Sequence, residues 1–315
     1  MGETRVTVQA TIRGYLTAFV DLLGISNRLE ALDRGALDGE LDPALKHQIA
    51  LIIFALDQFR KAFSKFYTAL VPLTAMDLAA SLAPGAATPE VVQFLQSIAP
   101  PAPLIHTFTD TVVVSVHLEG AKIASMYSAL YRLVMGCAAA SWTMLGFGIP
   151  VRGGISLGYG LVLDSGEVIG AGLVRAHRLE AKFAHVPRIV VDPRLLTDFQ
   201  PRNVKPDAPV AERYSKAIWE ETLGLLTRDA RDGQVFVDFL GPKAFELATN
   251  GTGKIGSTDM IGAIDRAISE RIPAPVRGES EDQWRVRSKW EWLDAYWKRN
   301  RALIMAHKND GQVNQ

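Results

Sequence analysis

The sequence is poor in cysteine, has no net charge and lacks an N-terminal secretion signal, and each shortage narrows what the protein can be. Its 315 residues contain a single cysteine, Cys137, so no disulfide can form within the chain. Cys137 lies in an apolar stretch, which favours a buried thiol over a nucleophile. The N-terminus, MGETRVTVQA, has no apolar segment typical of a signal peptide. We therefore expect a protein of the reducing cytoplasm.

The charge balance argues against partners that are bound through a large net charge on the protein. The 34 basic residues equal the 34 acidic ones, which predicts no nucleic-acid partner and no anionic membrane surface. The longest apolar run extends from Leu133 to Val151 and is borderline in length for a membrane span. Because Arg152 and a pair of glycines follow it directly, we expect a buried helix that runs into a strand.

Periodic patterns predict an α+β fold with a mixed sheet and packed helices. Residues 15–24 read as a strand that ends on Asp21 and turns at Gly24. Residues 104–118 read as a β-hairpin with Asp110 in its bend, and 150–163 and 187–191 as further strands, with a turn about Gly170. Apolar residues at helical spacing predict helices over 43–70, 120–142 and 173–184.

The chain changes character after residue 200. Helical patterns cover 211–226, 258–272 and 282–307, and a short strand is predicted over 235–240. The last helix is rich in aromatic residues, which we expect to dock on the domain or on a second subunit rather than to stack on nucleic-acid bases. We predict one domain over 10–200, with a helical insertion at about 43–100, and a mostly helical C-terminal extension over 201–315.

The predicted strand ends bring carboxylates to one sheet edge. Asp21 and Asp110 would lie close enough to share divalent cations, and carboxylate oxygens suit Mg²⁺ or Mn²⁺. A pair of such ions can activate an attacking hydroxyl and stabilise a triphosphate. Backbone N–H groups of the turn that opens the next helix suit phosphate oxygens; this turn comprises Leu22, Leu23, Gly24, Ile25 and Ser26.

Three segments resemble the class III nucleotide cyclases. Phe19, Asp21 and Gly24 match the first metal motif of that family, F-x-D-x-x-G. The family strand R-x-G-I-x-x-G is matched by Arg152, Gly154, Ile155 and Gly158. The motif G-x-x-V-N-x-A-x-R-L-E is partly matched by Gly170, Ala176, Arg178, Leu179 and Glu180.

The chain departs from the family at three positions. Thr109 stands where a glycine usually precedes the second metal aspartate, and His106 stands where the family has a base-recognising lysine. Val174 replaces the asparagine that holds the ribose. The long insertion, the missing lysine and the helix around residues 289–296 make the chain similar to the Pycsar pyrimidine cyclases of bacterial anti-phage defence.

The resemblance implies a ferredoxin-like, palm-type sheet and a two-metal reaction. It assigns metal binding to Asp21, Leu22 and Asp110, with two Mg²⁺ or Mn²⁺ ions per site, and transition-state stabilisation to Arg178. UTP or CTP would yield cyclic UMP or cyclic CMP, which would activate a separate effector. Active sites would lie at a homodimer interface, with the metals from one subunit and Arg178 from the other. Candidates for the base pocket are Arg60, Tyr67, His106 and Glu167.

Two alternatives remain open on sequence grounds. An adenylate or guanylate cyclase would keep the metal site and change only the base pocket. A degenerate cyclase-like domain would bind a nucleotide or dimerise without turnover, and Thr109 and Val174 favour it.

Overall fold

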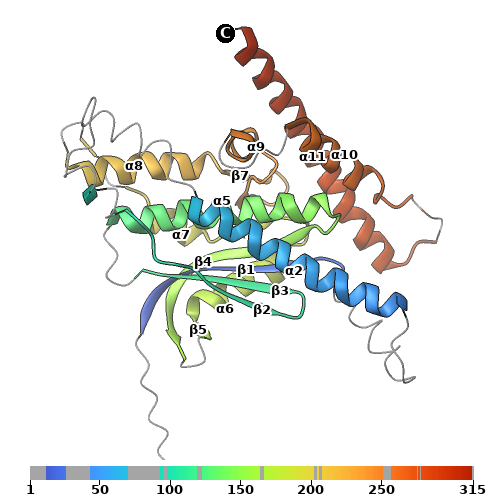
Figure 1. The fold of residues 1–315 in the computed structure, drawn as a ribbon, viewed down its shortest axis with the longest axis horizontal. Coiled ribbons are helices and arrows are strands. Elements are labelled where there is room, and N and C mark those ends of the chain that lie inside the picture. Colours follow the sequence, from blue (N-terminus) through green and yellow to red (C-terminus); the bar gives the residue numbers. More distant parts are fainter. Residues whose placement is uncertain are drawn as a thin grey trace, which may run out of the picture.

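The computed structural model describes residues 12–25, 43–69, 93–94, 98–118, 123–163, 167–201, 204–205, 208–250, 257–274, 276 and 278–313. Its centre is an eight-stranded sheet, with the path β2-β3-β1-β4-β6-β8-β7 and β5 paired to β4 (Figure 1). The strands are β1 (Arg13–Leu22), β2 (Leu104–Phe108), β3 (Thr111–His117), β4 (Val151–Val162), β5 (Val168–Gly170), β6 (Ile189–Val191), β7 (Leu226–Arg228) and β8 (Val235–Val237). The expected mixed α+β sheet is confirmed.

Strand β1 occupies the middle of the sheet, antiparallel to β3 on one side and to β4 on the other. Alternate side chains of β1 face opposite sides of the sheet. Leu16, Val20 and Leu22 are fully buried in the main core, whereas Phe19 and Asp21 face the other side. The sheet therefore has a core face and a second face on which Asp21 lies.

Helices cover both faces of the sheet. They are α2 (Pro43–Ala69), α5 (Ile123–Gly146), α6 (Ala171–Phe183), α7 (Pro193–Asp198), α8 (Val210–Leu223), α9 (Pro242–Asn250), α10 (Ser257–Ser269) and α11 (Glu281–Val313). On the core face, α5 contacts the sheet, and α2, α8, α9 and α10 pack around α5. Helix α6 packs on β1 and β4 from the second face (Figure 1).

Helix α5 is long and apolar enough to cross a membrane, but 83% of its apolar window is buried inside the molecule. Cys137 in this helix is fully buried, and burial raises the pKa of its thiol. The prediction of a buried helix with a core thiol is therefore confirmed. The ring of Phe63 from α2 lies where a Cβ at Gly136 would stand, which allows close approach of the helices.

Helix α11 docks through one face. Its side chains Leu293, Tyr296, Trp297 and Ile304 are buried against the rest of the chain. The indole Nε1 of Trp297 donates to Oδ1 of Asp265 at 2.7 Å, and the Tyr296 hydroxyl donates to Oδ1 of Asp238 at 2.5 Å. Because buried aromatic polar atoms need partners, these bonds fix the docking position. The aromatic helix packs on its own chain, one of the two modes expected.

Several short helices and strands were not predicted from the sequence. Strand β5 forms where a turn was expected, and β7, α7 and α9 were not predicted. A strand of three residues is too short to show alternation, so its pairing partner decides it. The sheet runs past residue 200, since β8 pairs with β6 and β7 with β8. The predicted domain division at residue 200 stays a prediction.

Candidate functional site

The end of β1 and the tip of the β2–β3 hairpin meet at one edge of the sheet. Asp21 pairs in register with Thr111, and the backbone N–H of Leu22 donates to the carbonyl oxygen of Asp110 at 2.9 Å. The structure therefore brings Asp21 and Asp110 to the same edge. The hydroxyl of Thr109 donates to Oδ1 of Asp110 at 2.8 Å.

Thr109 keeps the turn shape that glycine would favour. Its φ is 45°, in the left-handed region, and it is the one non-glycine residue with positive φ in the part of the chain described. A non-glycine residue pays for this conformation with some strain. The replacement of the family glycine by Thr109 therefore leaves the bend that presents Asp110 in place.

The turn after β1 has its predicted shape, but some of its side chains are buried in the core. Gly24 has a φ of 87°, which explains glycine at this position, and the N–H of Leu23 donates to the Pro150 carbonyl at 3.0 Å. The side chains of Leu22 and Ile25 are buried in the core, so only their backbone groups could meet a ligand. Ser26 lies outside the described residues.

An arginine links Asp21 to a buried glutamate. The Nε of Arg152 donates to Oδ2 of Asp21 at 2.7 Å, and its Nη2 lies 2.9 Å from Oε1 of Glu180 on α6. Glu180 is 5% exposed. Burial raises the pKa of the Glu180 carboxyl, Arg152 opposes that rise, and the nearby Asp21 and Asp110 charges add to it. Arg152 and Glu180 matched family motifs, but sequence reasoning assigned neither of them a role at this sheet edge.

The donor chemistry at this edge fits a hard cation. Asp21 and Asp110 offer carboxylate oxygens, and Glu180 Oε1 is buried without an aligned hydrogen bond. In the described segments, no three His, Cys, Asp or Glu side chains converge into a preformed metal set. The Arg152 side chain occupies Oδ2 of Asp21, so a cation bound at that oxygen would have to displace the Arg152–Asp21 hydrogen bond.

Arg178 lies on the outward side of α6. Arg178 is exposed, and Val174, one helical turn earlier, is 48% exposed, whereas Ala176 and Leu179 face the sheet. Residues four apart share a helix face. Val174 and Arg178 therefore point together away from their own sheet, and among the described residues the ion-pair partner of Asp21 is Arg152 and not Arg178.

The predicted base-pocket residues do not form one pocket in a single chain. His106 lies in β2 and shares the face of Phe19 through the register His106, Val113, Phe19. Its Nε2 is buried without a hydrogen-bond partner in the described part of the chain. Glu167 is exposed beside β5, which pairs with the far end of β4, about 30 Å along the strand from Arg152.

Tyr67 and Arg60, two of the residues predicted for the base pocket, lie away from the Asp21 edge. Both belong to α2, which packs on α5 over the core face, whereas Asp21 faces the other side. Tyr67 is 2% exposed, stacks on Phe63 and donates its hydroxyl to the Pro101 carbonyl at 2.9 Å. Burial accordingly raises the pKa of its phenol. Tyr67 is a core residue, and Arg60 is an exposed residue of the outer helix.

A cationic cavity that sequence reasoning missed adjoins this edge. It measures about 640 Å³, and its charged wall consists of Arg152, Arg231, Arg285 and Lys289. Burial lowers the pKa of Lys289, the Arg152 charge lowers it further, and Asp21 acts in the opposite sense. These four cations come from three segments that are far apart in the chain, namely β4, the β7–β8 turn and α11, so no single local motif could have indicated them.

Comparison with known proteins gives a weak likeness. No protein-family model and no curated protein matches the chain. The crystal structure of the guanylyl cyclase Cya2 is similar over 72% of this chain and 91% of that chain, with 13% sequence identity and a TM-score of 0.30. A score of this size does not carry the assignment of a function, which has to come from the residues themselves.

Proposed function

We propose that the chain is a nucleotide cyclase that converts UTP or CTP to the 3′,5′-cyclic monophosphate and pyrophosphate. The observation that supports this most strongly is the meeting of Asp21 and Asp110 at one sheet edge, held by the Leu22–Asp110 backbone bond of 2.9 Å. The turn that would bind the phosphates, with positive φ at Gly24, follows directly. The motif resemblance selects cyclisation among the reactions that two carboxylates and two cations can perform.

In the proposed reaction, the 3′-hydroxyl attacks the α-phosphate and the bond to the β-phosphate breaks. Bound Mg²⁺ or Mn²⁺ would activate the hydroxyl and neutralise the triphosphate. Asp21, Asp110 and the Leu22 carbonyl would hold these ions. Arg178 from a second subunit would face the charge that develops on the α-phosphate and the leaving pyrophosphate. The preference for a pyrimidine, and a role of the product in activating an anti-phage effector, rest on the Pycsar resemblance.

A homodimer is part of the proposal, because the outward face of α6 carries Arg178 away from its own chain. Val174 and Phe183 of α6 are 48% and 40% exposed, and Phe108, on the Asp21 face of the hairpin, is 51% exposed. Exposed apolar side chains around a charged residue suit a subunit interface. Covering this face with a second copy would bring Arg178 toward the partner's sheet edge.

The Arg152–Asp21 ion pair favours one alternative, a cyclase-like domain that binds nucleotides without turnover. An aspartate already bonded to an arginine at 2.7 Å is a poorer cation ligand unless the arginine moves. Val174 in place of the ribose-binding asparagine points the same way. A purine cyclase differs from our proposal only in the base.

The direct test is incubation of the purified full chain with ATP, GTP, CTP or UTP and Mn²⁺, followed by mass spectrometry of the products. We expect a cyclic pyrimidine nucleotide. Cyclic AMP or cyclic GMP would keep the cyclase and change the base. Nucleotide binding without any cyclic product would favour the inactive module.

Substitution of the two carboxylates that would bind the metal ions is a second test of the proposal. Asp21→Asn and Asp110→Asn remove a negative charge from the edge, so we expect loss of turnover by about a thousandfold or more. The melting temperature should stay near that of the wild type, because Asn keeps the side-chain shape. Full activity in either variant would refute the metal assignment.

A further inference from the structure

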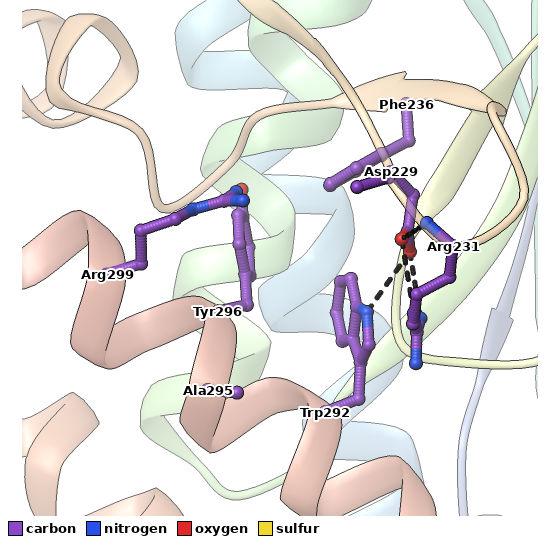
Figure 2. Close-up of a pocket in the computed structure, with 8 residues that line it drawn as sticks. Asp229, Arg231, Phe236, Trp292, Ala295, Tyr296 and Arg299 are labelled. Atoms are coloured by element: carbon purple, nitrogen blue, oxygen red, sulfur yellow. Dashed lines mark hydrogen bonds and ion pairs between the residues drawn. The ribbon is translucent and has the colours of Figure 1, made fainter.

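A small cavity of about 280 Å³ between the β7–β8 turn and α11 has its carboxylate already paired within the chain. Asp229 accepts hydrogen bonds from Arg231 at 2.8 Å and from the Trp292 indole at 3.2 Å (Figure 2). The rings of Trp292 and Tyr296 stack beside it, with their centres 5.0 Å apart. These groups dock α11 on the sheet, so the unassigned chemistry has to be sought elsewhere.

A larger cavity, of about 680 Å³, opens at the end of the sheet opposite to Asp21. It lies where Gly14 of β1 pairs with Tyr159 of β4, about 23 Å along β1 from Asp21. Its other walls come from the first turn of α5 and from α7. It has no lining residue in common with the cationic cavity beside Arg152.

The hollow exists because the core face of β1 has no side chain at Gly14. Leu16 and Val20 continue the same face and are fully buried under the helices, whereas Tyr159, the partner of Gly14, is 74% exposed. A Cβ added at Gly14 would have no atom within 4 Å. The sheet therefore extends past the helices that cover it and leaves open space beside its core face.

Much of the cavity wall is apolar. Met126 and Leu157 are half-buried, so each has surface left to contact a ligand. A cavity of this volume is in the range of small-molecule sites. Burial of apolar surface is favourable, so this wall selects a ligand with a hydrocarbon part. The apolar and aromatic side chains of the wall are Ile12, Leu118, Met126, Leu157, Tyr159 and Leu195.

Arg175 of α6 reaches the cavity at a break in the pairing of β4. Strand β6 pairs with β4 as far as Ile155, and β5 pairs with it from Gly160 onward. Between these pairings, Arg175 donates from Nε to Ser156 Oγ at 3.3 Å and from Nη2 to the Leu157 carbonyl. These two bonds fix the guanidinium, and within the described residues its Nη1 has no acceptor.

The charged groups of the cavity leave one positive charge in excess. The arginines Arg13, Arg175 and Arg194 stand against Asp192 and Asp198. Both oxygens of Asp192 are already used, since Oδ2 accepts from a hydroxyl of β4 at 2.6 Å and Oδ1 from the Arg194 backbone N–H at 3.0 Å. Asp192 Oδ2 is 3.9 Å from Nε of Arg175, at the limit of an ion pair. Its carboxylate therefore does not take up the remaining donors of Arg175.

Arg194 is the second available cation. Its guanidinium is exposed and forms no ion pair with any described carboxylate, Asp198 on the same helix included. A carboxylate would supply the acceptor that the donors of Arg175 and Arg194 lack. An anion with several charges would be repelled by Asp192 and Asp198, so the excess of one positive charge favours a single negative charge.

We propose that this cavity binds an amphipathic monocarboxylate, with its carboxylate on Arg175 and Arg194 and its hydrocarbon part against the apolar wall. The site is separate from the edge that carries Asp21 and Asp110. It does not depend on cyclase turnover, because it rests on the cavity, its apolar wall and its charges.

Calorimetric titration of the full chain with sodium decanoate, below its micellar concentration and without nucleotide or metal, tests the site. We expect one saturable site in the wild type and about tenfold weaker binding in Arg194→Gln, because a charge-assisted hydrogen bond is lost. Arg266→Gln is the matched control, since Arg266 is an exposed arginine of α10 outside the cavity. Its affinity should equal that of the wild type.

Gly14→Val tests the cavity itself. The valine side chain would fill the hollow, and it fits the fold because nothing lies within 4 Å of the added Cβ and valine is favourable in a strand. We expect decanoate binding to be lost. Melting curves of all variants check folding separately, and decyltrimethylammonium, with the same chain and the opposite charge, should show no saturable binding in its own titration.

Three results would overturn the proposal: no saturable decanoate binding by the wild type, unchanged binding by a folded Arg194→Gln, or equally tight binding of decyltrimethylammonium. The outcome is independent of the proposed reaction. Decanoate binding without a cyclic product would leave this site standing and remove the cyclase, whereas a cyclic product without decanoate binding would do the reverse.

Discussion

At the scale of single residues, Asp229 joins three parts of the chain. Its Oδ2 accepts a hydrogen bond of 2.6 Å from Nη1 of Arg188, which is 2% exposed. Arg231 and the Trp292 indole bind the same carboxylate. Although burial opposes ionisation, the hydrogen bonds from Arg231 and the charge of Arg188 together hold the pKa of Asp229 well below its usual range.

The Asp229→Asn variant should be less stable at neutral pH by about 3 kcal/mol, since it leaves a buried guanidinium short of its counter-charge. A depressed native pKa gives stability that is present above the unfolded pKa of about 3.9 and lost as the pH falls through the native value. We therefore expect the free-energy difference from the wild type to shrink below about pH 4. Urea unfolding at several pH values measures it.

The control for this prediction is Asp57→Asn. Asp57 forms an exposed ion pair with Lys61 on α2, so its loss should cost less than about 1 kcal/mol. A difference between wild type and Asp229→Asn that stays constant down to pH 3 would show that packing, and not charge, explains the effect.

At the scale of elements, the position of α6 depends on glycines in β4. A Cβ at Gly154 would stand 2.2 Å from the Ala176 carbonyl oxygen, and one at Gly158 would stand 2.5 Å from the Gly172 nitrogen. These are backbone atoms, which cannot turn aside. The lack of a side chain at Gly154 and Gly158 therefore lets α6 lie against the sheet, and this contact sets Glu180 beside Arg152.

Gly154→Ala should push α6 off the sheet and cost about 2 kcal/mol or more in unfolding free energy. Because α6 also carries Arg178, turnover should fall in the same variant. Gly14→Ala is a control in the neighbouring strand β1, where nothing lies within 4 Å of the added Cβ. Thermal unfolding of both variants checks the prediction, which fails if their melting temperatures drop equally.

At the scale of the whole molecule, the sheet edge and the outward face of α6 belong to different surfaces of one chain. Asp21 lies at the edge next to α11 and the cationic cavity, and Arg178 points away from its own sheet. In the reaction proposed above, the two residues would therefore act together only across the interface of a dimer. Closed twofold symmetry would give two equivalent sites.

Mixing two inactive variants tests the shared site. Asp21→Asn and Arg178→Ala should each be inactive as homodimers, but a mixed dimer contains one site with neither substitution. Random exchange of equal amounts should restore about a quarter of the wild-type activity. Recovery is read from cyclic product after subunit exchange, and no recovery in a mixture proven to contain mixed dimers would place both residues in one subunit.

The sequence by itself determined the elements with strong local patterns and the residues at their ends. The β-prone runs of β1 and β3, the bend at Asp110, the apolar stripe of α2 and the buried α5 all follow from local sequence. Such patterns predict the structure because the period of a helix or strand decides which of its side chains face the core. The meeting of Asp21 with Asp110 could therefore be predicted before any coordinates.

Only the tertiary structure decided which distant segments share a site. Arg152 reaches Asp21 and Glu180 because β4 pairs with β1 and α6 packs on both, and Lys289 arrives from a helix at the far end of the chain. Tyr67 became a core residue because α2 packs on α5, over the face opposite to Asp21. Contacts of this kind depend on strand register and helix docking, which the free energy of the whole core sets and no local pattern encodes.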